Sequence, residues 1–416
     1  MSPSRRAFLT SAAASVAAGS LSRVAGTWSS LAPDGRSSES PTASVREGDG
    51  YDPWIEVNPE ALRANARSIA EVADGRPVLA TIKNNGYGLG LEEAGEALAE
   101  AQEVTGLAVV KVEEAHRLRD AGVERPILLM THATDDEVRD LVRRDVELAP
   151  FSDGDGQRLE ALAADLGRSI PVHAYLDTGL GRLGMPYHRA LPWLEDLAER
   201  DGLEIQGAFM SFTEAPDFDR VQLERFTQLA AEAQDRGLSL GRLHAASSNH
   251  LTFLPDSFLD MVRPGLNLFG AHVAGGRDAA ALELTPAIRL RARVLRVERL
   301  RVGDSAGYGR DYVADDEVWV ATVPMGHADG YPREAVEGAR VLIGNDTYPV
   351  IGAVSASHCL VEVGPEERVR AGDVATLMGP DHDDVHPNTL SEVTGRSIYD
   401  ILMHLGAGLP KRPHAP

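Results

Sequence analysis

The strongest constraint on the fold is the alternation of short apolar runs with amphipathic segments after Trp54. Runs rich in Val, Ile and Leu are typical of buried strands, and the stretches between them, such as Leu91–Ala101 and Glu113–Ala121, are typical of helices. Eight such runs within roughly 200 residues predict a (β/α)8 barrel, whereas a doubly wound open sheet does not require eight strands. The candidate strands are Val78–Ile82, Leu107–Val110, Ile127–Met130, Val146–Ala149, Val172–Leu176, Ile205–Ser211, Leu243–Ala245 and Met261–Arg263.

The pattern changes past about Thr285. Further runs are rich in β-forming residues and are separated by Gly and Asp turns, and helical periodicity nearly disappears until Tyr399. We therefore predict an α/β barrel domain over residues 51–285 and a C-terminal β-rich domain over residues 286–416. The β-rich runs are Val294–Leu300, Val318–Val323 and Val369–Leu377.

The first 50 residues are predicted to lie outside the fold. Residues 1–26 contain the twin-arginine pattern Ser4-Arg5-Arg6-Ala-Phe8-Leu9 and an Ala-rich run, which is typical of a Tat export signal. The run is short and weakly apolar for a membrane anchor. Residues 27–50 are mostly Ser, Pro, Gly, Ala and charged residues, which indicates a flexible linker. We expect export to the periplasm or the exterior; the alternative is an incidental arginine pair in a tail.

Composition excludes several classes of protein. The formal net charge at pH 7 is −22, whereas a nucleic-acid-binding protein needs a basic surface. The single cysteine, Cys359, excludes an internal disulfide and a cysteine-based metal cluster. The 416 residues suffice for two domains with sizeable cores.

Lys83 is the most informative single residue. It follows the apolar run Val78–Ile82 and precedes a Gly-rich turn, so it is predicted to lie at the mouth of the barrel, where barrels place their chemistry. Only three of the 41 basic residues are lysines, so lysine is not the usual surface cation of this chain. A lysine in a partly apolar site loses its proton readily and forms Schiff bases, which an arginine does not. The alternative is a strand-end lysine paired with a carboxylate.

The segment Lys83-Asn-Asn-Gly-Tyr87-Gly-Leu-Gly90 resembles the pyridoxal-phosphate lysine motif of the alanine racemase family, Lys-x-Asn-x-Tyr-Gly-x-Gly. Six further stretches resemble this family of fold-type III enzymes in the same order, from about Trp54 to about Pro410. The resemblance implies a pyridoxal-phosphate-dependent racemase that interconverts L- and D-alanine. The six stretches are Trp54–Asn58 with Leu62 and Asn65, Leu176–Gly184, His244–Ser248, Val262–Gly265, Gly307–Gly309 and Gly326–Tyr331.

The resemblance implies a cofactor site on the barrel. Lys83 would bind pyridoxal phosphate and move a proton at the substrate α-carbon. Tyr87, Ser248 and Gly265 would bind the cofactor phosphate, in agreement with the rule that loops after barrel strands 7 and 8 bind phosphate; Ser248 alone would indicate a helix N-cap. Arg263 would face the pyridine nitrogen and leave it unprotonated, because arginine effectively keeps its own proton. The alternative for Arg263 is a structural salt bridge.

Racemisation needs a second acid/base on the opposite face of the α-carbon, and the resemblance assigns it to Tyr308. In the family this tyrosine comes from the β domain of the partner subunit, which implies a homodimer with composite active sites. Arg182 would contact the carboxylate of a small amino-acid substrate or the cofactor phenolate, since arginine suits planar anions. A packing tyrosine in a Gly-Tyr-Gly turn is the alternative for Tyr308. The resemblance implies no metal ion.

Four places depart from the family pattern. Tyr175 replaces a lysine that is often carbamylated, and Ser211 replaces a histidine that backs the pyridine-facing arginine. Ala356 and Ser357 replace a methionine and an aspartate, and because the first of these positions lines the substrate side, the pocket is predicted to be larger or differently polar. The stretch Ala407–Lys411 replaces a Tyr-Arg-Val-Pro-Arg pattern and loses a cofactor-side tyrosine.

These departures leave three functions open. The first is an alanine racemase acting by two bases, the second is an exported racemase of broad specificity, and the third is a catalytically weak pyridoxal-phosphate-carrying binding protein. The retained Tyr308 argues against the third, because a carrier has no need of a second base. A lyase or aldolase acting on D-amino acids would require a metal cluster; His358-Cys359 and Asp381–Asp384 offer candidate ligands, although a solvated acidic loop explains the latter.

Overall fold

The computed structural model describes residues 50–273, 282–405 and 408–413. The predicted export signal over residues 1–26 and nearly all of the predicted linker over residues 27–50 lie outside the described residues. Within the described ranges, no helix combines the length and the apolar character needed to cross a membrane.

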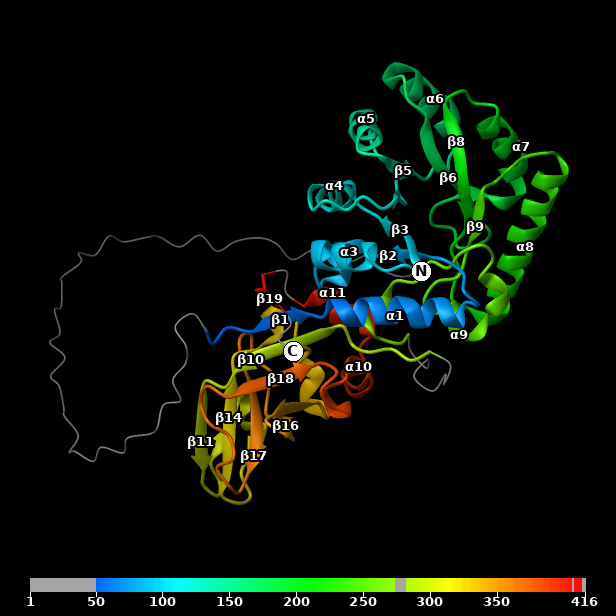
Figure 1. Ribbon diagram of the computed structural model, residues 1–416. Helices are drawn as coiled ribbons and strands as arrows, with labels where there is room; N and C mark the ends of the chain where they lie inside the picture. Colours follow the sequence, from blue (N-terminus) through cyan, green and yellow to red (C-terminus); the bar gives the residue numbers. More distant parts are fainter. Residues whose placement is uncertain (1–49, 274–281, 406–407, 414–416) are drawn as a thin grey trace, which may run out of the picture. The chain divides into compact units, whose positions relative to one another are not determined.

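The barrel domain is a curved sheet of parallel strands connected by helices (Figure 1). Each strand pairs with the next one along the chain, and a short strand, β7 (Met185–Pro186), is added beside β6. The strands are β2 (Val78–Thr81), β3 (Val104–Val109), β4 (Ile127–Leu129), β5 (Val146–Leu148), β6 (Ile170–Asp177), β8 (Leu203–Phe209) and β9 (Arg242–His244).

The eighth predicted strand, Met261–Arg263, is reduced to two β-bridges that close the ring. Met261 bridges to His244 of β9, and Val262 bridges to Val78 of β2. Val262 N donates to Pro77 O at 3.0 Å, and Leu79 N donates to Val262 O at 2.9 Å. The segment ends at Pro264, which has no N–H to continue a ladder. The predicted barrel is therefore confirmed, with one strand shortened to a bridging segment.

Helices alternate with the barrel strands as the sequence pattern predicts. The first helix begins at a capped N-terminus, where Asn58 Oδ1 accepts hydrogen bonds from Glu60 N and Ala61 N. The helices are α1 (Pro59–Val72), α2 (Lys83–Tyr87), α3 (Leu91–Ala99), α4 (Val112–Asp120), α5 (Asp135–Arg143), α6 (Asp155–Leu166), α7 (Tyr187–Ala198), α8 (Pro216–Asp235) and α9 (His250–Phe253).

Side chains from successive strands fill the interior of the ring. Leu79, Ala108, Leu128, Ala149, Tyr175, Phe209 and Met261 form one buried cluster, and they come from β2, β3, β4, β6, β8 and the segments after β5 and β9. A filled interior leaves the strand ends as the place for a ligand cavity.

The second domain is a β sheet with two short helices, α10 (Pro387–Thr394) and α11 (Ile398–His404). A separate two-stranded hairpin joins β12 (Ser305–Ala306) to β13 (Tyr312–Val313). The β-rich domain predicted from the sequence is thus confirmed. The order of strands across the main sheet is β11 (Arg296–Leu300), β14 (Val318–Val323), β17 (Cys359–Gly364), β16 (Asp346–Ile351), β15 (Arg340–Ile343), β18 (Val374–Met378), β10 (Ile288–Arg293), β1 (Trp54–Val57) and β19 (Lys411–Pro413).

Strand β1 precedes the barrel in sequence but pairs with the second sheet. It runs antiparallel to β10 and parallel to β19. The range 51–285 predicted for the barrel therefore begins with one strand of the other sheet. A four-residue apolar strand shows no signal of which sheet it joins, because its partners lie more than 200 residues away in sequence.

Candidate active site

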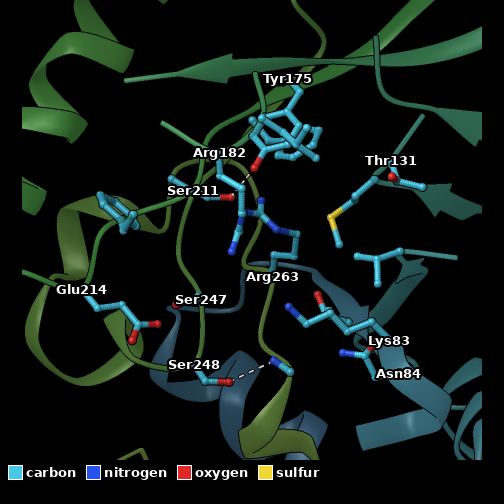
Figure 2. A pocket seen from close by; sticks show the side chains of 18 of the residues that line it. Lys83, Asn84, Thr131, Tyr175, Arg182, Ser211, Glu214, Ser247, Ser248 and Arg263 are labelled. Atoms are coloured by element: carbon cyan, nitrogen blue, oxygen red, sulfur yellow. Dashed lines mark hydrogen bonds between the residues drawn. The ribbon is translucent and has the colours of Figure 1, made fainter. Parts of the chain in front are cut away.

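Lys83 opens α2 directly after β2 and lines a cavity of about 420 Å³ at the end of the barrel strands (Figure 2). Among the described residues, its ammonium group has no hydrogen-bond or ion-pair partner, so the predicted alternative of a lysine paired with a carboxylate is not what the structure has. Burial, followed by the positive charges of Arg182 and Arg263, lowers the pKa of Lys83. Desolvation and like charge both favour the neutral amine, which is the nucleophilic form.

The turn after Lys83 has an unusual backbone. Asn84, Asn85, Gly86 and Tyr87 all have left-handed φ angles, between 55° and 60°. Such a conformation is costly for L-residues other than Gly and, to a lesser degree, Asn. Buried Glu114 stabilises the turn by accepting from Asn85 N at 2.9 Å and from two backbone N–H groups of the neighbouring loop. The turn therefore directs the Lys83 side chain from a fixed base.

Tyr87, Ser248 and Gly265, the residues predicted to bind phosphate, lie together on one wall of the cavity. Ser248 Oγ accepts from Gly265 N at 2.9 Å and from Asn267 N at 3.3 Å, which joins the loops after β9 and after the bridging segment. A Cβ at Gly265 would lie 1.9 Å from Tyr87 Oη, so only glycine lets the backbone approach this hydroxyl. Hydroxyls beside close backbone N–H groups form a cradle suited to an anion such as phosphate.

Arg263 lies in the buried centre of the site. Its guanidinium donates to Met210 O at 2.7 Å and to His244 Nδ1 at 2.6 Å. Burial lowers the pKa of Arg263 to about 10, so the group is still a cation at neutral pH. The predicted alternative of a salt bridge is not observed among the described residues, where its partners are a carbonyl and a neutral ring.

A chain of imidazoles continues behind Arg263. His244 Nε2 contacts His173 Nδ1 at 2.9 Å, and His173 Nε2 lies 3.1 Å from Glu147 Oε2. Since arginine only donates, His244 Nδ1 must accept, and the proton of His244 is then on Nε2. Burial, followed by the charge of Arg263, lowers the pKa of His244 well below its usual value, which keeps the ring neutral. The backing histidine that Ser211 appeared to remove is therefore supplied by His244.

Tyr175 and Ser211, the two barrel positions that depart from the family pattern, contact each other. Tyr175 Oη lies 3.0 Å from Ser211 Oγ, and the Tyr175 ring stacks on Phe209 at 4.2 Å. Arg182, which follows β6, lines the same cavity, and within the described ranges its guanidinium has no hydrogen-bond or ion-pair partner. The replacement of a lysine by Tyr175 thus leaves Arg182 available for an anionic ligand.

Sequence reasoning missed a hydrogen-bonded set beside the phosphate cradle. Ser247 Oγ contacts His250 Nδ1 at 2.9 Å, and His250 Nε2 contacts Asp219 Oδ2 at 3.1 Å, with both His250 and Asp219 fully buried. Burial lowers the pKa of His250. Asp219 accepts from the Nε2–H group of His250, so His250 Nδ1 accepts from the Ser247 hydroxyl. Ser247 also lines the cavity. No sequence spacing signals this set, because Asp219 lies on α8 and Ser247 lies in the loop after β9.

Tyr399 of α11 also lines the cavity, with its ring centroid 6.1 Å from that of Tyr87. The stretch Ala407–Lys411 was predicted to leave the site without a cofactor-side tyrosine. The cavity nevertheless contains a tyrosine, which comes from an earlier position in the chain. The sequence feature that could have identified this tyrosine is the place of Tyr399 at the start of the last amphipathic segment. Ala407 itself lies outside the described residues.

Tyr308 and Ala356 do not line this cavity within one chain. Tyr308 lies on the β12–β13 hairpin, where its side chain is 77% exposed. Ala356 lies in the loop between β16 and β17, where its carbonyl accepts from Ala328 N at 3.0 Å. Both predicted residues belong to the β domain, and the structure of the single chain does not bring them to Lys83.

The candidate metal ligands near the C-terminus are engaged elsewhere. Asp381 contacts Arg289 at 2.9 Å, and Asp384 contacts Arg340 at 3.1 Å. In the part of the chain that the structure describes, no three or more His, Cys, Asp or Glu side chains are grouped as metal ligands would be.

A barrel with a lysine at its mouth, joined to a β domain, defines a class of pyridoxal-phosphate enzymes. Residues 57–273 match the model of the alanine racemase N-terminal domain, and residues 287–413 match that of the alanine racemase C-terminal domain. The chain therefore belongs to the alanine racemase family, as its motifs predicted, and members of this family generally depend on pyridoxal phosphate.

Individual relatives agree with this assignment. The alanine racemase of Desulforamulus reducens is 31% identical over 364 residues, which cover 86% of this chain and 98% of the relative. The alanine racemase of Symbiobacterium thermophilum is 32% identical over 369 residues, which cover 87% and 97%. The solved alanine racemase of Streptomyces coelicolor A3(2) matches with a TM-score of 0.80 and 27% identity, covering 88% of this chain and 99% of that one.

Proposed function

We propose that this protein is a pyridoxal-phosphate-dependent racemase that interconverts L- and D-alanine. The observation that carries the proposal is the free Lys83 amine with its lowered pKa, which faces a cavity that also contains Arg182 and Arg263. An amine nucleophile beside cationic groups suits an anionic carbonyl cofactor and an amino-acid carboxylate.

The residues of the cavity fit the cofactor. Tyr87, Ser248 and the backbone of Gly265 would bind its phosphate, because a Cβ at Gly265 would fill the space beside Tyr87 Oη. The buried hydroxyl of Thr81, which also lines the cavity, has no partner within the described part of the chain and suits a ligand oxygen. When bound, pyridoxal phosphate supplies an electron sink for the charge that develops at the substrate α-carbon.

Two residues would move protons at the α-carbon. Lys83 acts on one face, where its lowered pKa makes the neutral amine available at a lower pH than in free lysine. Tyr308 acts on the opposite face. Since Tyr308 is exposed and lies outside the cavity of its own chain, it reaches the site of a second subunit, and Ala356 would approach the substrate from the same domain. The active form is then a homodimer with composite sites.

Arg182 and Arg263 would act by charge rather than by proton transfer. Arg182 binds the substrate carboxylate, which fixes the orientation of the α-carbon between the two bases. Arg263, held by Met210 and His244, would face the pyridine nitrogen and keep it unprotonated. Arg263 would thereby favour return of the proton to the α-carbon over side reactions.

The direct test is to incubate the purified protein with pyridoxal phosphate and L-alanine, and to separate the enantiomers by chiral chromatography. We expect equal amounts of L- and D-alanine at equilibrium. Borohydride reduction should fix the cofactor on the peptide that contains Lys83. A cofactor fixed on the peptide of Lys111, or no D-alanine, would refute the assignment.

We also propose that the protein is exported by the twin-arginine route, on the basis of Arg5 and Arg6 ahead of Phe8-Leu9 and the Ala-rich run. This route carries folded proteins, so a protein that must acquire its cofactor in the cytoplasm suits it. Replacing both arginines by Lys should retain the protein in the cytoplasm. Continued export of that variant, measured by cell fractionation, would contradict the proposal.

A further inference from the structure

Glu214 is a carboxylate that none of the roles above uses. It lies in the loop between β8 and α8 and lines the cavity, on the side opposite Lys83 in the view of Figure 2. Among the described residues that line the cavity it is the single carboxylate, whereas Lys83, Arg182 and Arg263 carry positive charge.

The backbone at Glu214 is strained, and the residues on either side of it are fixed by hydrogen bonds. Its φ angle is 63°, in the left-handed region that L-residues adopt only with strain. Thr213 N donates to Gln222 Oε1 at 2.9 Å, and Ala215 N donates to Asp219 Oδ1 at 3.3 Å. Gln222 and Asp219 are fully buried on α8, so both flanks of the strained residue are fixed. A strained polar residue at the edge of a cavity indicates a functional constraint.

The carboxylate is not used to balance the cations of the cavity. Burial, followed by the negative charge of Asp219, raises the pKa of Glu214, and the positive charges of Lys83 and Arg182 act in the opposite direction. Neither cation forms an ion pair with Glu214, and within the described ranges no other group donates to it. A glutamate that served only to neutralise the site would contact one of these cations. Glu214 is instead left with free acceptor oxygens that point into the ligand space (Figure 2).

We propose that Glu214 binds the cationic side chain of the substrate, so that the racemase acts on basic amino acids such as lysine in preference to neutral amino acids of the same length. This substrate class rests on the racemase function proposed above. A substrate ammonium or guanidinium would form a charge-assisted hydrogen bond with the carboxylate. Apolar Phe212 and Leu183 line the same cavity and would cover the methylene stem of such a side chain.

The first experiment uses the wild-type holoenzyme with L-lysine and L-norleucine, which share a straight four-carbon side chain that ends in an ammonium group only in lysine. We expect kcat/KM to be about tenfold or more higher for lysine, the effect of one charge-assisted hydrogen bond. A higher kcat/KM for norleucine would overturn the proposal. Failure to racemise alanine, lysine and norleucine alike would instead refute the racemase function itself.

The second experiment uses Glu214→Gln, which keeps the shape and removes the charge, and Glu214→Asp, which keeps the charge. The ratio of kcat/KM for lysine to that for norleucine should fall about tenfold or more in Glu214→Gln and be largely kept in Glu214→Asp. Glu204→Gln, an exposed position on β8, the strand that precedes the loop of Glu214, is the matched control. An equal fall of kcat/KM for alanine, norleucine and lysine in Glu214→Gln would overturn the proposal, because it would show a proton-transfer or structural role.

Discussion

At the scale of single residues, the charges around Lys83 set the pH at which its amine becomes reactive. Burial and the cations Arg182 and Arg263 lower its pKa, so the neutral amine is present at a lower pH than in free lysine. Arg182→Gln removes one of these cations and should raise the pKa. The pH midpoint for capture of pyridoxal phosphate by the cofactor-free protein, followed by absorbance, should therefore move upward. Arg189→Gln, on the exposed start of α7, is the control; an unmoved midpoint in Arg182→Gln would contradict this reasoning.

Arg263 shows how a single side chain selects one reaction among several. Its guanidinium is fixed by Met210 O and by the neutral ring of His244, so it presents a permanent positive charge to the site. Arg263→Glu would favour a protonated pyridine nitrogen and a stronger electron sink. The ratio of transamination to racemisation should then rise about tenfold, equivalent to about 1.4 kcal/mol in relative barrier height. Formation of pyruvate from alanine measures the side reaction, and an unchanged ratio would show that Arg263 does not face the ring.

At the scale of elements, the left-handed turn over residues 84–87 is the least ordinary part of the barrel. Asn85 has a φ angle of 59°, and its side chain accepts from Arg117 at 3.0 Å. Asn85→Gly and Asn85→Val both lose this hydrogen bond, so comparing the two variants isolates the conformational cost of the left-handed backbone at position 85. The Val variant should be less stable than the Gly variant by about 1–2 kcal/mol, because β-branched residues avoid this conformation. Equal urea midpoints for the Gly and Val variants would show that the turn moves out of the left-handed conformation in the Val variant.

The elements differ in how far the sequence could predict them. Val78–Ile82 and the other barrel runs carry their own apolar pattern, so their strands and order could be predicted. The Lys83 motif also identified the cavity. By contrast, the partner strands of β1 and the relay from His244 to Glu147 depend on contacts between residues far apart in sequence. Glu214 carried no signal at all, because a glutamate in a loop becomes informative only when its strained backbone and free carboxylate are known.

At the scale of the whole molecule, the β12–β13 hairpin is the part that a single chain leaves unexplained. Tyr308 and Val313 of the hairpin are 77% and 42% exposed, and Val302, in the turn just before β12, is 67% exposed, which places three large apolar side chains in solvent on or beside one small hairpin. An exposed apolar group of this kind is typical of a protein–protein contact. Since the cavity of the same chain lacks Tyr308, a dimer that covers the hairpin would also complete the active site.

This arrangement predicts complementation between two inactive proteins. Lys83→Ala removes the base on one face, and Tyr308→Phe removes the hydroxyl on the other, so each homodimer should racemise alanine at a small fraction of the wild-type rate. If Tyr308 crosses to the partner subunit, a mixed dimer has one site with both intact groups. Mixing the two variants with subunit exchange should then restore about a quarter of the wild-type activity. About half of the dimers would be mixed, and each mixed dimer would hold one complete site of two. Subunit exchange is followed with affinity-tagged subunits. In Tyr308→Phe, Lys83 should still exchange the α-proton of one enantiomer with deuterated water.

No recovery despite measured subunit exchange would place both residues in one subunit or make Tyr308 structural. A near wild-type rate for Tyr308→Phe in both directions would rule out the two-base mechanism and turn attention to Ser247 and His250, the other polar pair beside the cofactor wall.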